Sequence, residues 1–445
     1  MRLSLTDQQV STLFEQLVDA DRRFDDVWPG DPSGRQPVHV VYGGAQLYKA
    51  GAAQKLGQLA QRSLQSYAGD VADFAEAFGL PNELAATVHE RVSQKLGSQA
   101  IEDQRIDFED GYGYRPDDEE DAHALSAADA VAQGMQDGTL PPFIGIRIKS
   151  FSPECRQRAL RTLDLFLTRL AEKTTAILPD NFVICLPKVT DADQVSALAT
   201  ALEQIEQACG YTADSLKLEI MLETTQSVIA ADGRVPIRAM VEAAKGRCVS
   251  VHFGTYDYTA ACNISASHQT HDHPVADLAR QLMQAALAGT GVFMSDGATT
   301  RMPIPPHKGG ELKDQQKSEN RQAVHGAWRE HYENVRRSLR NGFYQSWDLN
   351  PAQLPARYAA VYAFFLEALP DAQQRLQSFI NKAAQANLVG STFDDAATGQ
   401  GLLNFFLRGL ACGALNEEDM SVTGLSLQDL QSRSFMQIVA EHSAK

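Results

Sequence analysis

Residues 216–257 hold the feature that most constrains the fold of this chain. An alternating apolar run, 216–222, ends at Glu223, and after a helical segment a second apolar run, 248–253, breaks and reaches Asp257. Parallel α/β proteins bring the carboxyl ends of their strands to one edge of the sheet, so this order places two carboxylates near each other. Such oxygens suit a hard divalent cation. The segment therefore predicts a parallel sheet with a metal site at its carboxyl edge.

Eight apolar runs separated by helical segments favour an α/β chain folded as a (β/α)8 TIM barrel over an open doubly wound sheet. The expected strands are 38–42, 105–109, 143–148, 182–186, 216–223, 248–253, 290–294 and 344–349. The sequence has neither the G-x-G-x-x-G nor the P-loop signature of nucleotide-binding sheets. We expect an N-terminal helix and loop (1–37), a barrel catalytic domain (38–369) and a C-terminal helical extension (370–445).

Three local signals add helix boundaries to this prediction. Ser152 and Pro153 are expected to begin the helix after the third strand, because a hydroxyl cap followed by proline is typical of a helix start. Thr190 is expected to cap the helix after the fourth strand, which Gly210 closes. Pro370 is expected to interrupt the helical C-terminal part.

Composition excludes several classes of partner. The formal charge of −16 is spread along the chain, which argues against nucleic-acid binding. No window of eighteen uncharged apolar residues is present, so no membrane span is expected. The six cysteines form no C-x-x-C pair, and the N-terminus turns polar too early for a signal peptide, so we expect a cytoplasmic protein.

Charged residues end six of the expected strands. They are Asp107 and Glu109, Arg147 and Lys149, Lys188, Glu223, Asp257, and Asp296. Any one of them could simply mark a strand reaching water, but strand parity lets them point together into a barrel mouth. Glu219 lies mid-strand on the same inward face and is expected to need a basic partner in the core.

This set predicts a specific chemistry. Glu223 and Asp257 would bind Mg²⁺, with Mn²⁺ as the alternative ion, and a 2-keto acid could chelate the open side. The metal would act as a Lewis acid and stabilise an enolate at the adjacent carbon. Arg147 would neutralise the oxyanion or hold the carboxylate. Asp107 and Glu109 could orient metal-bound waters, and Lys188 adds positive charge.

The strand-end segments resemble a known enzyme superfamily. The segments are 106–110 (Ile-Asp-Phe-Glu-Asp), 145–148 (Gly-Ile-Arg-Ile), 186–188 (Leu-Pro-Lys), 222–224 (Leu-Glu-Thr) and 254–258 (Gly-Thr-Tyr-Asp-Tyr). In this order they resemble the superfamily of citrate lyase β-chains, malyl-CoA lyases and 2-keto-diacid aldolases. The resemblance implies a TIM barrel, Mg²⁺ at Glu223 and Asp257, and reversible C–C bond chemistry. Lys149 and Asn350 differ from the residues usual at their positions.

The strand-end residues and the resemblance together predict which residues carry the reaction. Arg147, Lys188, Asp107 and Glu109 would be catalytic, and Arg147, Lys149, Gly254, Thr255 and Asp296 would contact the substrate. Turn chemistry alone could explain Asp296, because it precedes a glycine. Three histidines within 268–273 suggest either a transition-metal site or, by our preference, a solvated loop.

We therefore predict a Mg²⁺-dependent carbon–carbon lyase or aldolase that acts on a 2-keto acid or an acyl substrate. Whether that substrate is a CoA thioester is left open, since no adenine-nucleotide motif decides it. A malate-synthase-like condensation of an acyl-CoA with a keto acid is the alternative within the same class. A non-catalytic barrel that binds an anionic metabolite is the alternative of another class. We expect a homo-oligomer that binds neither nucleic acid nor membrane.

Overall fold

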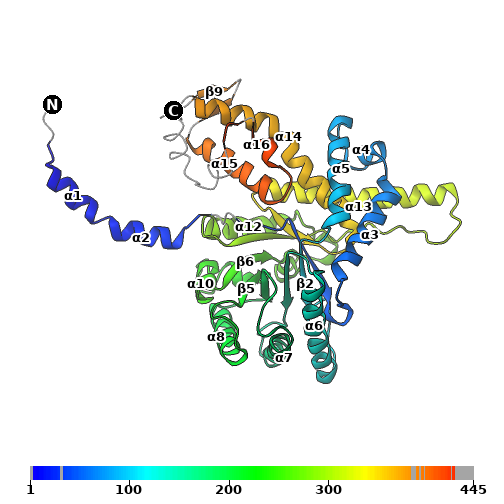
Figure 1. Ribbon diagram of the computed structural model, residues 1–445, viewed down its shortest axis with the longest axis horizontal. Coiled ribbons are helices and arrows are strands. Elements are labelled where there is room, and N and C mark those ends of the chain that lie inside the picture. Colours follow the sequence, from blue (N-terminus) through cyan, green and yellow to red (C-terminus); the bar gives the residue numbers. More distant parts are fainter. Residues whose placement is uncertain are drawn as a thin grey trace.

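A closed barrel of eight parallel strands forms the centre of the computed structural model (Figure 1). The strands are paired in sequence order, and β1 closes the barrel against β8. They are β1 His39–Gly44, β2 Asp103–Asp107, β3 Phe143–Arg147, β4 Phe182–Leu186, β5 Lys217–Leu222, β6 Cys248–Phe253, β7 Phe293–Ala298 and β8 Gln345–Asp348. The predicted α/β TIM-barrel fold is confirmed. The structure describes all residues except 1–3, 31–33, 382–386, 390, 391, 395, 422 and 426–445.

Helices surround the barrel and extend beyond it. They are α1 Asp7–Glu15, α2 Val18–Val27, α3 Ala52–Ala68, α4 Val71–Phe78, α5 Asn82–Ser98, α6 Asp117–Asp137, α7 Arg156–Thr174, α8 Ala192–Cys209, α9 Thr225–Val228, α10 Ile237–Ala243, α11 Thr255–Ala261, α12 Pro274–Leu287, α13 Asp314–Arg340, α14 Leu354–Asn381, α15 Ala396–Ala411 and α16 Glu417–Ser421. A short antiparallel pair, β9 Asn387–Val389 and β10 Thr392–Asp394, lies outside the barrel. Each helix in the described part of the chain is too short or too polar to cross a membrane.

Strand parity sorts the side chains as the sequence predicts. Ile144, Ile146 and Ile148 are buried in one apolar core together with Leu218 and Ile220. This core lies between the outer face of the barrel and helices such as α6, α7 and α8. Because neighbouring residues on a strand point to opposite faces, the charged residues between these apolar ones point into the barrel.

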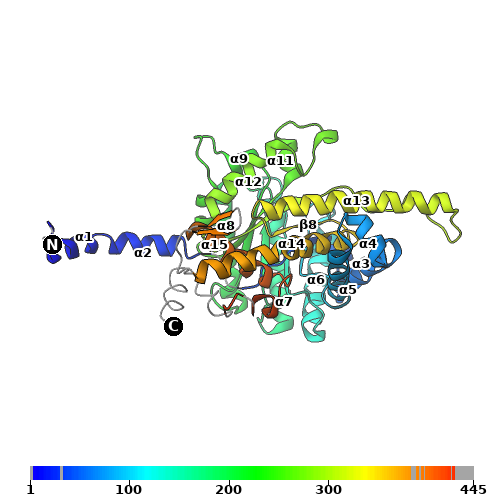
Figure 2. The same cartoon turned by 90° about the horizontal axis from the view of Figure 1, so that it is seen from above.

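A second apolar core joins segments that are far apart in the sequence. Helices α3, α4 and α5, inserted between β1 and β2, pack against α13 and α14 (Figures 1 and 2). Trp328 and Phe365 are fully buried there, and Tyr358 donates a hydrogen bond to the carbonyl of Ala100 at 2.8 Å. The helices inserted between β1 and β2 thus form one helical layer with α13 and α14 beside the barrel.

Several predicted boundaries are wrong. Strand β7 begins at Phe293 and includes Asp296 and Gly297, because pairing with β8 continues to Ala298 through a region with turn propensity. Helix α7 begins at Arg156, since Ser152 belongs to a preceding turn. Helix α8 is capped by the side chain of Asp191 instead of Thr190.

The two ends of the chain also differ from expectation. Helix α14 runs through Pro370 without a break. Residues 7–27 form two helices where one was expected. Residues 426–445 of the expected C-terminal extension lie outside the described residues.

Candidate active site

Most of the predicted charged residues gather at the carboxyl ends of β2 to β6. A cavity of about 750 Å³ opens there. Its wall includes Glu109, Asp110, Lys149, Lys188, Glu223, Thr224 and Asp257, together with Glu154 and uncharged residues from the segments after β3 and β4. Such a cavity at the carboxyl end of a barrel is the usual position of an active site in this fold.

Arg147 and Asp107 form a buried pair between neighbouring strands. The Nε and Nη2 atoms of Arg147 donate hydrogen bonds of 2.7 and 2.6 Å to the two oxygens of Asp107. The same carboxylate accepts hydrogen bonds from the backbone amides of Glu109 and Gly111. The guanidinium also lies over the ring of Tyr42, 4.7 Å from its centroid. Asp107 is therefore occupied in orienting Arg147, whose Nη1 atom extends to within 3.2 Å of Glu109 Oε2.

Lys188 connects the acidic residues of the cavity. Its Nζ atom lies 2.5 Å from Glu109 Oε1, 3.1 Å from Asp110 and 3.6 Å from Asp257 Oδ2. Although burial acts to lower it, nearby carboxylates, led by Glu223, raise the pKa of Lys188 above its usual value. The residue has a φ of +52°, a left-handed conformation that costs energy in a side chain of this kind. Its backbone amide donates a 2.7 Å hydrogen bond to Glu223 Oε1, which helps hold that conformation.

Glu223 is the most perturbed acid of the cavity. It is 2 % exposed, and the Lys188 amide bonds only one of its oxygens. Burial, reinforced by the charge of Asp257 and opposed by Lys188, raises the pKa of Glu223 to about 8. Gly254 makes room for this carboxylate, since a Cβ atom on residue 254 would lie 2.4 Å from Glu223 Oε2. The site thus holds a buried acid in a close-fitting space, where the cost of burial outweighs the opposite charge of Lys188.

These residues fit a two-carboxylate metal site. Mg²⁺ is commonly held by one or two carboxylates and keeps several waters, which matches Glu223 and Asp257 beside an open cavity. Among the described residues no group of three or more His, Cys, Asp or Glu side chains is arranged around one metal position. A site with three or four protein ligands, as transition metals usually take, does not fit this part of the chain.

The remaining predicted substrate contacts divide into two groups. Lys149 borders the cavity, but its Nζ atom is 2.7 Å from Glu120 Oε2 and donates a 2.8 Å hydrogen bond to the Phe108 carbonyl. Its ammonium is therefore already paired within the protein. Thr255 and Asp296 are about 1 % exposed and, like Arg147 and Gly254, are not among the residues of the cavity wall.

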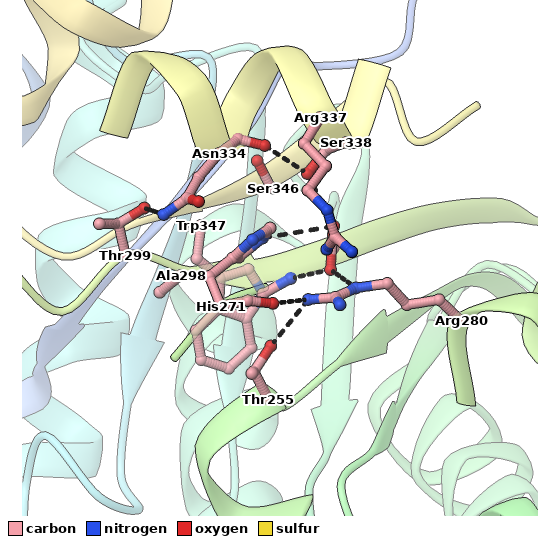
Figure 3. A network of polar contacts seen from close by, with 12 residues as sticks. Thr255, His271, Arg280, Ala298, Thr299, Asn334, Arg337, Ser338, Ser346 and Trp347 are labelled. Atoms are coloured by element: carbon pink, nitrogen blue, oxygen red, sulfur yellow. Dashed lines mark hydrogen bonds and ion pairs between the residues drawn. The ribbon is translucent and has the colours of Figure 1, made fainter. Parts of the chain in front are cut away.

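Asp296 belongs to a separate buried network between β7, α12 and α13. It pairs with Arg280 at 2.6 Å and with His271 at 3.3 Å, and Ser338 donates a 2.7 Å hydrogen bond to it. Figure 3 shows Arg280 reaching Thr255 and His271, with Ser338 approaching from α13. Burial acts to raise the pKa of Asp296, but Arg280 and His271 hold it well below its usual range. Its predicted role as a substrate contact remains untested.

The three histidines of 268–273 point to different partners. His268 contacts serine hydroxyls of its own loop, and His271 is buried against Asp296. His273 caps α12 by accepting a hydrogen bond from the Val275 amide. The preferred solvated-loop interpretation is thus right for His268 and wrong for His271, which is 3 % exposed.

Comparison with known proteins places the chain in a family. The model of a domain of unknown function, DUF6986, matches residues 17–438. The chain belongs to the DUF6986 family. A comparison with curated proteins gave no match.

Solved structures support the fold of this DUF6986 chain. A citrate lyase from Burkholderia xenovorans LB400 is similar, with a TM-score of 0.58 and 18 % identity, over 88 % of this chain and 97 % of that chain. A malate synthase from Haloferax volcanii, in a magnesium and glyoxylate complex, covers 93 % of this chain and 98 % of its own at 15 % identity. Its TM-score of 0.44 is too low to carry an argument.

The interior of the DUF6986 barrel contains polar residues that sequence reasoning missed. Arg105 pairs with Glu219 through contacts of 2.6 and 3.0 Å and also with Asp103. This confirms that Glu219 needs a basic partner. His252 lies 3.2 Å from Glu219 and 3.3 Å from the Tyr42 hydroxyl. Parity on β2 could have identified Arg105, because it shares the inward face with Asp103 and Asp107.

Proposed function

We propose that this protein is a Mg²⁺-dependent enzyme that makes or breaks a carbon–carbon bond beside the carbonyl of a 2-keto acid. The observation that carries the proposal is the buried Glu223 carboxylate, which borders one cavity with Asp257 and Lys188. A buried acid whose charge is disfavoured by its surroundings is a natural position for a cation. Perturbed acids in a barrel mouth are also typical of catalytic sites.

Glu223 and Asp257 would hold the cation. Bound there, Mg²⁺ would supply a Lewis acid that polarises the keto oxygen of the substrate. The tight contact between Gly254 and Glu223 would keep one of these carboxylates in position. Mn²⁺ prefers similar oxygen ligands and is expected to replace Mg²⁺.

Arg147 and Lys188 would bind the anionic oxygens of the substrate. Asp107 accepts hydrogen bonds from two nitrogens of Arg147, so the guanidinium is oriented before the substrate binds. Lys188 reaches three carboxylates of the cavity wall and can exchange one of them for a substrate carboxylate. Both cations would then stabilise negative charge that develops on the keto acid.

Two further observations favour a lyase or an aldolase as the reaction class. The strand-end segments resemble those of the citrate lyase and keto-acid aldolase superfamily, and a citrate lyase shares the fold. The cavity of about 750 Å³ exceeds the needs of a three-carbon acid, so the second part of the substrate would lie along the wall formed by the segments after β3 and β4. An acyl-CoA partner remains within this proposal.

Proton exchange provides the test. The protein is incubated with pyruvate or oxaloacetate in D₂O, and loss of the methyl or methylene proton signal is followed by NMR with Mg²⁺ or with EDTA. We expect exchange that requires the metal and disappears in Glu223→Gln. The matched control is Glu203→Gln, because Glu203 is exposed on α8 and should leave exchange unchanged.

The same experiment separates the enzyme from the alternative of another class. No exchange with Mg²⁺ or Mn²⁺ across a panel of keto acids would contradict the proposal. Saturable keto-acid binding in that case would assign the barrel to metabolite binding without catalysis.

A further inference from the structure

The N-terminal arm, residues 4–28, stands away from the rest of the molecule. Figures 1 and 2 both show α1 and α2 extending from the body on one side. Neither helix contains a buried residue. Isolated helices of nine or ten residues are marginal in water, so these two need a surface to pack against.

The arm exposes many large apolar side chains. Seven large apolar side chains are 44–63 % exposed: Leu5, Leu13, Phe14, Leu17, Val18, Phe24 and Trp28. If each hides roughly 100 Å² on docking, the arm contributes on the order of 700 Å². A standard stable interface takes about 800 Å² from each partner, so one arm is close to sufficient.

The charge of the arm argues for a protein surface as its partner. It has six carboxylates (Asp7, Glu15, Asp19, Asp21, Asp25, Asp26) and two arginines (Arg22, Arg23), a formal charge of −4. Helices that lie on membranes are rich in lysine and arginine on their polar face. An acidic arm instead fits a basic protein groove.

Such a groove lies between α12 and α13. It is a cavity of about 370 Å³ whose wall includes Arg280, Arg337, Arg340 and one acid, Asp277. Both oxygens of Asp277 are bound by Arg337, and Arg280 also contacts it. The Nη1 atom of Arg337 is buried and lacks a hydrogen-bond partner among the described residues. Arg340 is exposed, so the groove keeps excess positive charge.

The base of the arm lies beside this groove. The Gly30 amide donates a 2.8 Å hydrogen bond to the carbonyl of Gly289, just after α12, and the Trp28 ring stacks 5.4 Å from the Arg238 guanidinium. The arm then leads away from its own body, so it does not cover its own groove (Figure 1). A twofold axis near this base would lay each arm across the groove of the other copy.

We propose that the chain forms a dimer in which the arm of each copy docks into the arginine groove of a second copy. Each copy carries both an arm and a groove, so two copies can make the same contact twice and form a closed, symmetric dimer. This inference does not depend on the proposed function, because the groove lies outside the candidate active site.

Two variants of the full chain test the two halves of the contact by analytical ultracentrifugation. The arm variant is Leu13→Asp with Phe24→Asp. The groove variant is Gln281→Glu with Arg340→Glu, which spares the ion pairs of Arg280 and Arg337. Each variant should raise the dimer dissociation constant by about 100-fold or more. The control Ile177→Asp changes an exposed apolar residue of the body, which is 62 % exposed, and should stay dimeric.

Mixing the two variants gives the decisive result. An arm-defective copy still has its groove, and a groove-defective copy still has its arm, so the mixture should form heterodimers where each variant alone is monomeric. Circular dichroism melts confirm that both variants fold. A monomeric wild type, a variant that dimerises like wild type, or a mixture that stays monomeric would each overturn the proposal. Arm-to-arm pairing, in particular, predicts that the groove variant alone dimerises like the wild type, because its arm is unchanged.

Discussion

Replacing Gly254 with alanine should displace the Glu223 carboxylate and weaken Mg²⁺ binding. The added Cβ would lie 2.4 Å from Glu223 Oε2 and 2.5 Å from Glu223 Cβ, whereas ordinary contacts begin at 3.4 Å. The carboxylate or the backbone must therefore move by about 1 Å. The φ of Gly254 is −95°, which alanine adopts readily, so the effect arises from the contact and not from backbone strain.

The size of the effect follows from this displacement. A shift of about 1 Å in a positioned group commonly costs on the order of 100-fold in function, and loss of a ligand's support costs 10–100-fold in metal affinity. We expect the Mg²⁺ dissociation constant to rise by about 100-fold and metal-dependent proton exchange to fall in parallel. Calorimetry with Mg²⁺ and electron paramagnetic resonance with Mn²⁺ measure the affinity directly.

A second glycine provides the control for this substitution. Gly43, in β1, has nothing within 4 Å of the position that a Cβ would take, so Gly43→Ala should bind Mg²⁺ like the wild type. Thermal denaturation checks that both variants remain folded. If Gly254→Ala folds and binds Mg²⁺ with wild-type affinity, Glu223 is not a metal ligand and the reasoning fails.

Further predictions concern the metal ligands and the barrel interior. Glu223→Gln and Asp257→Asn should each abolish tight Mg²⁺ binding in calorimetry without unfolding the barrel, and unchanged affinity in both would sink the ligand assignment. Arg105→Leu should destabilise the protein by about 3–5 kcal/mol in denaturant titrations, because it leaves the buried Glu219 carboxylate without its partner. A loss under 1 kcal/mol, within the range of about 0–1 kcal/mol for exposed ion pairs, would show that the pair is not buried in solution. Burial lowers the pKa of His252 from 6.5 to about 4, so folding favours the neutral ring. The stability that this contributes is complete above pH 6.5 and lost as pH falls toward 4, so His252→Gln should flatten the stability profile in that window. If His252→Gln has the same pH dependence of stability as the wild type, the assignment of this dependence to His252 is wrong.

The resemblance to keto-acid lyases and the strand-end charges both predict a functional site at the carboxyl edge of the barrel. Strand parity alone places Arg147 and Glu219 inside the barrel, because the alternation of side chains along a strand is independent of the neighbouring strands. The partners of these residues were harder to predict. Arg105 meets Glu219 across 114 positions of the chain, and only the strand order and register bring the two together.

Helix and strand ends were the weakest part of the sequence-based prediction. Asp296 and Gly297 have strong turn propensity, yet pairing with β8 on both sides of them incorporates them into β7. Pro370 breaks isolated helices, yet α14 continues through it, with residues before and after it packed in the same core. In each case tertiary contacts outweigh a local preference of a few kcal/mol or less.

The sequence by itself determined the eight-stranded parallel barrel and the edge at which its charges collect. Both follow from local periodicity, in which each residue's neighbours along the chain decide which way it points. Only the tertiary structure decided what those charges do. It showed that Asp107 holds Arg147, that Lys188 bridges three acids, and that Glu223 is buried beside Gly254. Pairing, burial and the resulting pKa depend on distances between strands, and such distances exist only once the barrel has closed.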